Sequence, residues 1–119
     1  MRKILSVDDS VSTLTLVRET LREEYKVYVV TSGEEALSFL KKQKPDLILM
    51  DFYMIGLDGL ETLERMNEIE GFDIPVVMLT SISTKPLEET CRQLGAVAFI
   101  PKPFDPNVLK KTIADVFEG

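Results

Sequence analysis

Apolar residues in this chain fall into short runs separated by longer segments with helical spacing. The runs Leu47 to Met50 and Ile74 to Leu79 are apolar throughout, which is typical of strands buried on both faces of a parallel sheet. Further strands are predicted at Lys3 to Val7, Lys26 to Val30 and Val97 to Ile100. The chain is therefore expected to alternate five strands with five helices.

The helices are predicted from capping residues and from apolar positions three or four residues apart. The expected start signals are Asp9 or Ser10, a capping box from Ser32 to Glu35, Gly59, Ser83 or Thr84 with Pro86, and Asp105 with Pro106. The residues expected to face the core are Val11, Leu14, Val17, Leu21, Ala36, Leu37, Leu40, Leu60, Leu63, Met66, Leu109, Ile113, and Val116 or Phe117.

Five strand–helix repeats predict a flavodoxin-like, doubly wound α/β fold in one domain over residues 1–119. The common strand order for such a sheet is 2-1-3-4-5, which places the first and third strands side by side. Ligands bind at the carboxyl ends of the strands in these folds. The polar residues expected at that edge are Asp8, Asp9, Asp51, Thr80 and Lys102.

Composition restricts the chemistry available at this edge. The sequence has no histidine, which excludes Ser-His-Asp and Cys-His catalysis and zinc sites that use imidazole. A net charge of −6 disfavours nucleic-acid binding, no apolar run is long enough to span a membrane, and a lone Cys91 suits a reducing cytoplasm. A metal site must then use oxygen ligands, which favours magnesium or calcium.

Three carboxylates at one edge favour a divalent cation that leaves room for a phosphate oxygen. Magnesium fits this description because it takes few protein ligands and retains water. Asp51 can then act as a nucleophile toward a phosphoryl group, while Lys102 supplies positive charge and Thr80 a hydroxyl donor.

With these residues the chain resembles the response-regulator receiver domains of two-component signalling, over essentially its whole length. The resemblance rests on the Asp-Asp pair, LMD…DG around Asp51, Thr80, and the KPF at residues 102–104. It implies that Asp51 is the phosphoacceptor and that Mg²⁺ is held by Asp8, Asp9, Asp51 and the Tyr53 backbone carbonyl. It also implies that Thr80 and Lys102 bind the phosphoryl oxygens, that Phe99 is an aromatic switch, and that the Lys102–Pro103 peptide is cis.

The implied function is a phosphorylation-switched signalling domain, not an enzyme beyond its own phosphorylation and dephosphorylation. The phosphoryl group would come from a sensor histidine kinase or histidine phosphotransfer protein. That partner is expected to contact Leu16, which points about 145° away from the buried helix face, together with Pro103 and Phe104. The face of the fourth helix, fifth strand and fifth helix would signal to an effector protein or a fused output domain. No nucleic acid or membrane binding by this cytoplasmic domain is expected.

The sequence departs from the family pattern at three places. Ile55 replaces the usual proline four residues after the phosphoacceptor, Phe99 replaces a frequent tyrosine, and residues 95–99 lack the acidic pair of winged-helix regulators.

Three alternative functions compete with this one. A flavodoxin-like FMN module would need a phosphate loop where Asp8 and Asp9 stand. A haloacid-dehalogenase-type phosphatase would need an aspartate at Tyr53. The third alternative is a degenerate receiver that serves only as a protein-binding scaffold.

Overall fold

Strands and helices alternate along the whole chain in the computed structural model, which describes residues 1–81 and 84–119. The first half comprises β1 (Lys3–Val7), α1 (Val11–Leu21), β2 (Lys26–Val30), α2 (Gly33–Leu40) and β3 (Leu47–Met50). The second half comprises α3 (Gly59–Asn67), β4 (Val76–Thr80), α4 (Lys85–Gln93), β5 (Ala96–Pro101) and α5 (Pro106–Glu118). The predicted order of elements is confirmed, although β4 begins and ends later than expected and β5 is longer at both ends.

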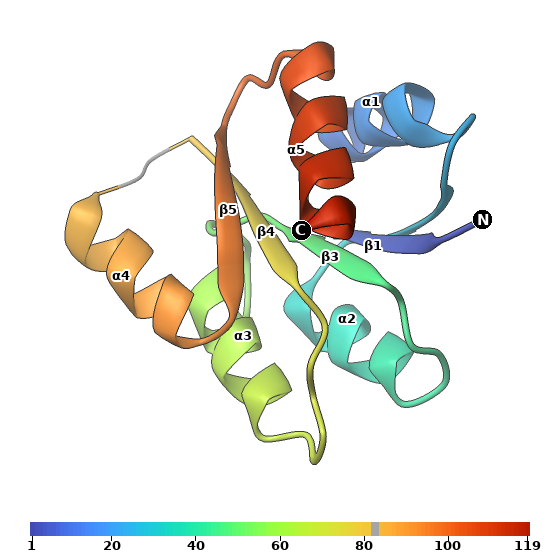
Figure 1. The fold of residues 1–119 in the computed structure, drawn as a ribbon. Coiled ribbons are helices and arrows are strands. Elements are labelled where there is room, and N and C mark those ends of the chain that lie inside the picture. The colour runs from blue at the N-terminus through green and yellow to red at the C-terminus, as the bar shows by residue number, and fades with distance from the viewer. Residues whose placement is uncertain (82–83) are drawn as a thin grey trace.

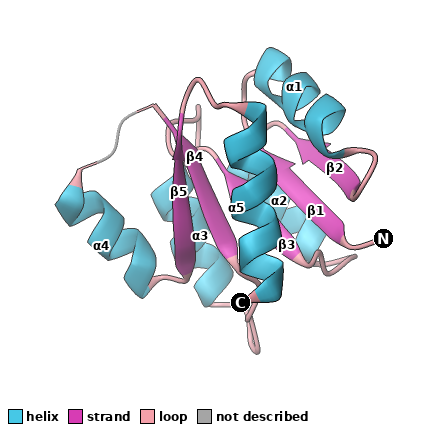
Figure 2. Cartoon of the chain, turned by 45° about the horizontal axis from the view of Figure 1, so that its top comes forward, coloured by secondary structure: helices cyan, strands magenta, loops and turns pink. Residues whose placement is uncertain are grey.

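The five strands form one parallel sheet in the order β2-β1-β3-β4-β5, which confirms the predicted fold class. Helices α1 and α5 cover one face of the sheet, and α2, α3 and α4 lie on the other (Figure 1; Figure 2). This arrangement buries the central strands on both faces, as their continuous apolar runs require.

Alternate residues of the central strands enter two separate apolar cores. Ile4, Leu47 and Leu49 pack with Val17 and Leu21 of α1 and with α5. The neighbouring positions face the opposite way, and that second core contains Leu5, Val7, Ile48, Met50, Ala36, Leu63, Met66 and Cys91. The period of two along each strand therefore divides its side chains between the two helical layers.

Helix starts agree with the sequence except in two details. Ser10, Thr84 and Asp105 are the caps of α1, α4 and α5, whereas the alternative cap Ser83 lies outside the described residues. The predicted Ser32–Glu35 box is only half formed: the Glu35 backbone N–H donates to Ser32 Oγ, but the Glu35 carboxylate accepts from Thr31. The complete capping box is at Asp58 and Glu61, a site that sequence analysis missed.

The predicted inward position of Val11 is wrong. Val11 is the first residue of α1 and is 67% exposed, whereas Leu14, Val17 and Leu21 further along the helix are buried. The other residues expected to face the core are buried, or half-buried against one of the two cores. Within the described ranges, no helix is long and apolar enough to cross a membrane.

Candidate functional site

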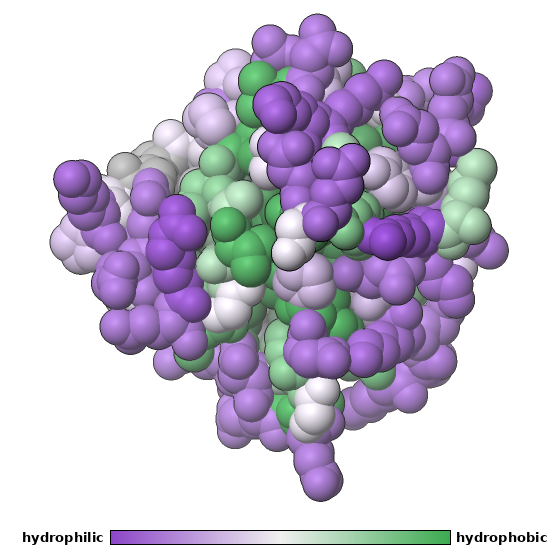
Figure 3. Space-filling model, in the orientation of Figure 1, coloured by the Kyte–Doolittle hydropathy of each residue, from purple (hydrophilic) through white to green (hydrophobic). Residues whose placement is uncertain are grey.

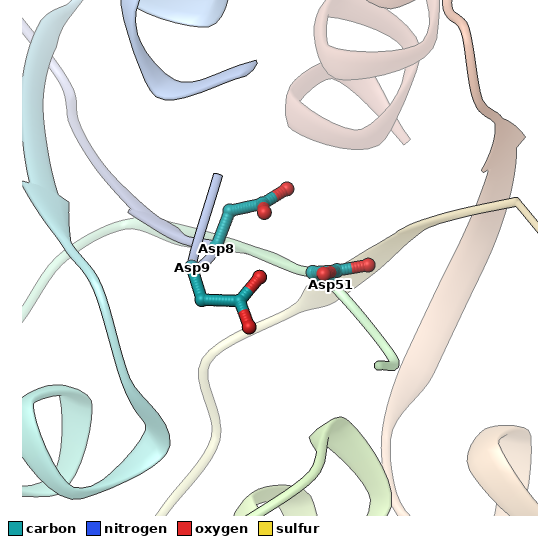
Figure 4. A group of neighbouring side chains, drawn as sticks. All are labelled: Asp8, Asp9 and Asp51. Carbon is teal, nitrogen blue, oxygen red and sulfur yellow. The ribbon is translucent and has the colours of Figure 1, made fainter. Parts of the chain in front are cut away.

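The carboxyl ends of β1 and β3 lie side by side and carry the acidic residues. Val7 pairs with Met50, and the Asp51 backbone N–H donates to the Val7 carbonyl at 2.9 Å, so Asp8 and Asp51 are neighbours. One carboxylate oxygen from each of Asp8, Asp9 and Asp51 lies within 4.8 Å of the other two. The three side chains leave two strands and converge on one space (Figure 4). The structure therefore brings together the three carboxylates that the sequence predicted.

These carboxylates differ in their exposure to water. Asp8 is 2% exposed and Asp51 is 5% exposed, whereas Asp9 is an exposed residue. Asp8 Oδ1 accepts the Ser10 backbone N–H at 2.9 Å, which fixes its orientation at the start of α1. The site therefore has two buried carboxylates and one at the surface.

Lys102 supplies the positive charge between the two buried carboxylates. Its Nζ lies 2.6 Å from Asp8 Oδ2 and 3.3 Å from Asp51 Oδ1. Burial lowers the pKa of Lys102, but hydrogen bonds and charge attraction from Asp8 and Asp51 outweigh it, so the pKa lies above its ordinary value. Lys102 is therefore a permanent cation at the mouth of the site.

One ammonium does not compensate for the burial of Asp51 beside other carboxylates. Burial first, and the Asp8 charge second, raise the pKa of Asp51 to about 6, although Lys102 acts in the opposite direction. Asp51 is therefore mostly ionised at neutral pH but is less stabilised as an anion than a surface aspartate. An ionised carboxylate that is poorly stabilised is suited to act as a nucleophile.

Close backbone packing behind Asp51 explains the glycine in the DG pair. A Cβ on Gly59 would clash with the Asp51 carbonyl oxygen and with Phe52 Cα, so a larger residue would force the backbone to shift. The Gly59 N–H donates to the Phe52 carbonyl at 2.7 Å, and Asp58 caps α3 next to it. The start of α3 thus holds the end of β3 in place.

The donor set at this edge fits a small divalent cation. All three acidic side chains offer hard oxygen ligands close together. Asp8 Oδ2 is fully buried, and within the described residues it has no hydrogen bond beyond its ion pair with Lys102. A cation at this edge would compensate the excess of negative charge that one lysine leaves.

Thr80 and Lys102 are adjacent across β4 and β5. Thr80 pairs with Pro101, and the Lys102 backbone N–H donates to the Thr80 carbonyl at 3.0 Å. Thr80 is buried and, with Glu88 and Phe99, lines a hollow between β4, α4 and β5.

Phe99 is half-buried and packs against the core that α2, α3 and α4 cover. The Arg92 guanidinium carbon lies 4.9 Å from the centre of the Phe99 ring. Sequence analysis did not find the Arg92 contact, because nothing in the spacing distinguishes this arginine from a solvated one.

The remaining predicted residues surround the site. Leu16 is exposed on α1, as expected. Tyr53 is half exposed, and the centre of its ring lies 4.7 Å from the centre of the Phe52 ring. The Lys102–Pro103 peptide is cis, which confirms that expectation. Pro103 is exposed, whereas Phe104 is half-buried against the core of α1 and α5.

Comparison with known proteins gives a consistent family. A family model described as the response regulator receiver domain matches residues 4–114. Sporulation initiation phosphotransferase F of Bacillus subtilis is 33% identical over 112 residues, which cover 93% of this chain and 90% of that protein. A crystallised chemotaxis protein, CheY4 of Vibrio cholerae, matches with a TM-score of 0.89 at 34% identity, over 98% of both chains.

Other relatives are much longer than this chain. The protein-glutamate methylesterase/protein-glutamine glutaminase of Clostridium acetobutylicum is 36% identical over 121 residues, which are 98% of this chain but 35% of that protein. The chain thus spans about a third of that relative's length. From the site, the fold and these matches, the chain belongs to the response regulator receiver domains, the signalling domains that accept a phosphoryl group on an aspartate in two-component systems.

Proposed function

We propose that residues 1–119 form one receiver domain in which Asp51 is the phosphoacceptor. The observation that carries this proposal is the environment of Asp51, which is buried at the end of β3, 3.3 Å from Lys102 Nζ, with a pKa raised to about 6. Because these 119 residues contain no histidine, the phosphohistidine donor lies outside them. That donor is a sensor histidine kinase or a histidine phosphotransfer protein.

In the proposed reaction, an Asp51 carboxylate oxygen forms a bond to phosphorus while the phosphorus–nitrogen bond of the donor imidazole breaks. The imidazole leaves with the bonding electron pair. Lys102, 3.3 Å from Asp51 Oδ1, would stabilise the negative charge on the phosphoryl oxygens, and Thr80, at the carboxyl end of β4 next to Lys102, would donate its hydroxyl to one of them. Hydrolysis of the acyl phosphate by water regenerates the Asp51 carboxylate, so the domain's own catalysis is limited to these two steps.

Asp8, Asp9, Asp51 and the Tyr53 backbone carbonyl would hold Mg²⁺ in this proposal. When bound, the cation supplies the positive charge that lets a phosphoryl group approach three carboxylates. The Ser10 N–H and the Lys102 ammonium already hold Asp8, and Lys102 also holds Asp51. Two of the proposed ligands are therefore preorganised. The partner protein would dock on exposed Leu16 and on Pro103 and Phe104, on either side of this mouth.

The proposed output is a change at the face formed by α4, β5 and α5. Apolar surface lies over β5 between α4 and α5 (Figure 3), where exposed Val97 and half-buried Ala98 and Val116 line a hollow. A phosphoryl group on Asp51 would attract the Thr80 hydroxyl, and the hollow beside Thr80 gives Phe99 space to turn inward. An effector protein or a fused output domain would read this face, in the cytoplasm.

Amide NMR tests the Thr80 relay. In Thr80→Ala, a phosphoryl mimic such as beryllofluoride should still bind, but the shifts of Phe99 and α4 should be much smaller than in the wild type. Equal shifts in the two proteins would remove Thr80 from the proposal.

Intact mass tests the phosphoacceptor. Incubation of the wild type with a small phosphodonor and Mg²⁺ should add one phosphate, and Asp51→Asn should add none. Asp73→Asn, an exposed aspartate before β4, is the matched control and should be labelled like the wild type. Labelling of Asp51→Asn at the wild-type level, or no labelling of the wild type, would leave the protein-binding scaffold as the better account.

A further inference from the structure

The exposed member of the acidic site, Asp9, is held by a different element from the other two. Lys102 and Ser10 hold the buried carboxylates, but neither contacts the Asp9 carboxylate. Instead, the backbone N–H of Ile55 donates to Asp9 Oδ2 at 3.1 Å. In the part of the chain that the structure describes, this is the one hydrogen bond that the Asp9 side chain accepts.

Without this bond, nothing in the described structure would keep Asp9 in the cluster. Its carboxylate is exposed and lies within 4.8 Å of two like charges, so repulsion favours a rotamer that turns toward water. One N–H occupies only one of the roughly four lone-pair positions of a carboxylate, so the bond leaves oxygen sites for a cation. The contact therefore orients Asp9 without using up its capacity as a ligand.

The contribution of Ile55 comes from its backbone and not from its side chain. The residue is 86% exposed, which leaves its side chain few contacts to lose. Gly56 follows with a φ of +84°, in the left-handed region, and this turn belongs to the same loop that leads from Asp51 to α3. A proline at position 55 would have no N–H to give, whereas any other residue would.

We propose that the Ile55 backbone N–H is a positioning donor that orients Asp9 for cation binding, so that the residue type at position 55 sets the affinity of the acidic site for Mg²⁺. This inference rests on the proposed function, since it assumes that the acidic site takes Mg²⁺. It adds a contact from the loop after Asp51 to the side chains that hold the cation. Partners that orient metal ligands typically change metal affinity by about 10- to 100-fold when they are removed.

Calorimetric titration with Mg²⁺ alone tests the proposal through the pair Ile55→Pro and Ile55→Ala. The alanine variant keeps the N–H and should bind Mg²⁺ within about twofold of the wild type. The proline variant should bind about tenfold more weakly or worse. Equal affinity of the two variants would overturn the proposal. Thermal unfolding without Mg²⁺ shows whether the proline variant is folded.

Amide hydrogen exchange of the metal-free wild type gives a second measurement that needs neither proline nor metal. The Ile55 amide should be protected in the wild type, and Asp9→Ala should speed its exchange about tenfold, because the acceptor is gone. Unchanged exchange would overturn the proposal even if the proline variant failed to fold. If the wild type itself takes up no Mg²⁺, the proposed function fails, and the exchange result still decides whether Ile55 orients Asp9.

Discussion

The two ends of the sheet use the same charged residue types in opposite ways. At the amino ends of β3 and β4, Lys44 Nζ lies 2.8 Å from Asp73 Oδ1, and both side chains are about 70% exposed. At the carboxyl ends, Lys102 lies between Asp8 and Asp51, whose side chains are almost fully buried. The amino end has a one-to-one ion pair in water. Among the described residues, the carboxyl end brings three carboxylates to one ammonium, and two of those carboxylates are buried.

This difference appears in the pKa values of the two aspartates, Asp73 and Asp51. At the amino end, the hydrogen bond and charge of Lys44 lower the pKa of Asp73, as expected for an ordinary exposed pair. At the carboxyl end, burial and neighbouring carboxylates raise the pKa of Asp51 despite Lys102. The carboxyl end thus has an excess of negative charge that a bound cation would relieve, whereas the Lys44–Asp73 pair at the amino end is balanced.

The largest expected effect comes from removing one ligand of the proposed cation. Asp9→Ala should slow Mg²⁺-dependent labelling by a small phosphodonor at least about 100-fold. Removing a group that only orients a metal ligand weakens metal binding or activity by about 10- to 100-fold, and removing a ligand itself should cost at least the upper value. The rate is measured by intact mass at several Mg²⁺ concentrations. If the variant were labelled at the wild-type rate without Mg²⁺, Asp9 would have no role in metal binding. Glu23→Ala, an exposed acidic residue just after α1, is the matched control.

A charge imbalance at the carboxyl end should appear in the pH dependence of stability. Because the folded pKa of Asp51 is raised to about 6, its contribution to stability is present below its ordinary pKa and is lost as the pH rises through about 6. The metal-free wild type should therefore lose about 1–3 kcal/mol of unfolding free energy relative to Asp51→Asn between about pH 5 and about pH 7.5. Urea unfolding of both proteins at the two pH values measures this difference. Parallel pH profiles would contradict the raised pKa.

A smaller effect is expected at the surface that flanks the site. Leu16→Ala should slow phosphoryl transfer from the partner kinase about tenfold. Truncation of an apolar interface residue that costs about 1.4 kcal/mol of binding free energy corresponds to this factor. Labelling by a small phosphodonor should not change, because Leu16 is an exposed apolar residue outside the acidic cluster. Equal slowing with both donors would indicate a change in the fold and not in docking.

The smallest effect is expected at the amino end. Lys44→Ala should change the free energy of unfolding by less than about 1 kcal/mol, since exposed ion pairs contribute little. Its labelling by a small phosphodonor should equal that of the wild type. A loss of labelling would mean that the two ends are coupled, which would contradict the contrast drawn between them.

The sequence predicted the sheet, its strand order and the acidic residues because each has a strong local signal. Buried parallel strands are continuous apolar runs, and polar residues directly after them must lie at the carboxyl edge. Val11 was misplaced because helical spacing says which face a residue is on but not how far the rest of the fold covers the first turn. The Ile55–Asp9 bond was not predicted because a backbone N–H gives no sequence signal, although the absence of proline at position 55 was a visible sign that a donor was present. The complete cap at Asp58 does have a sequence signal, because Glu61 follows three positions later at the start of an apolar helix face.

The central claim is that the carboxyl end of the sheet carries a phosphoacceptor and that Asp51 is that residue. Reduction of the phosphorylated protein with borohydride converts an aspartyl phosphate to homoserine, which peptide mapping locates. Homoserine should appear at position 51, only after treatment with both phosphodonor and Mg²⁺. Homoserine at Asp8, Asp9 or an exposed aspartate such as Asp73, with Asp51 unchanged, would contradict the account.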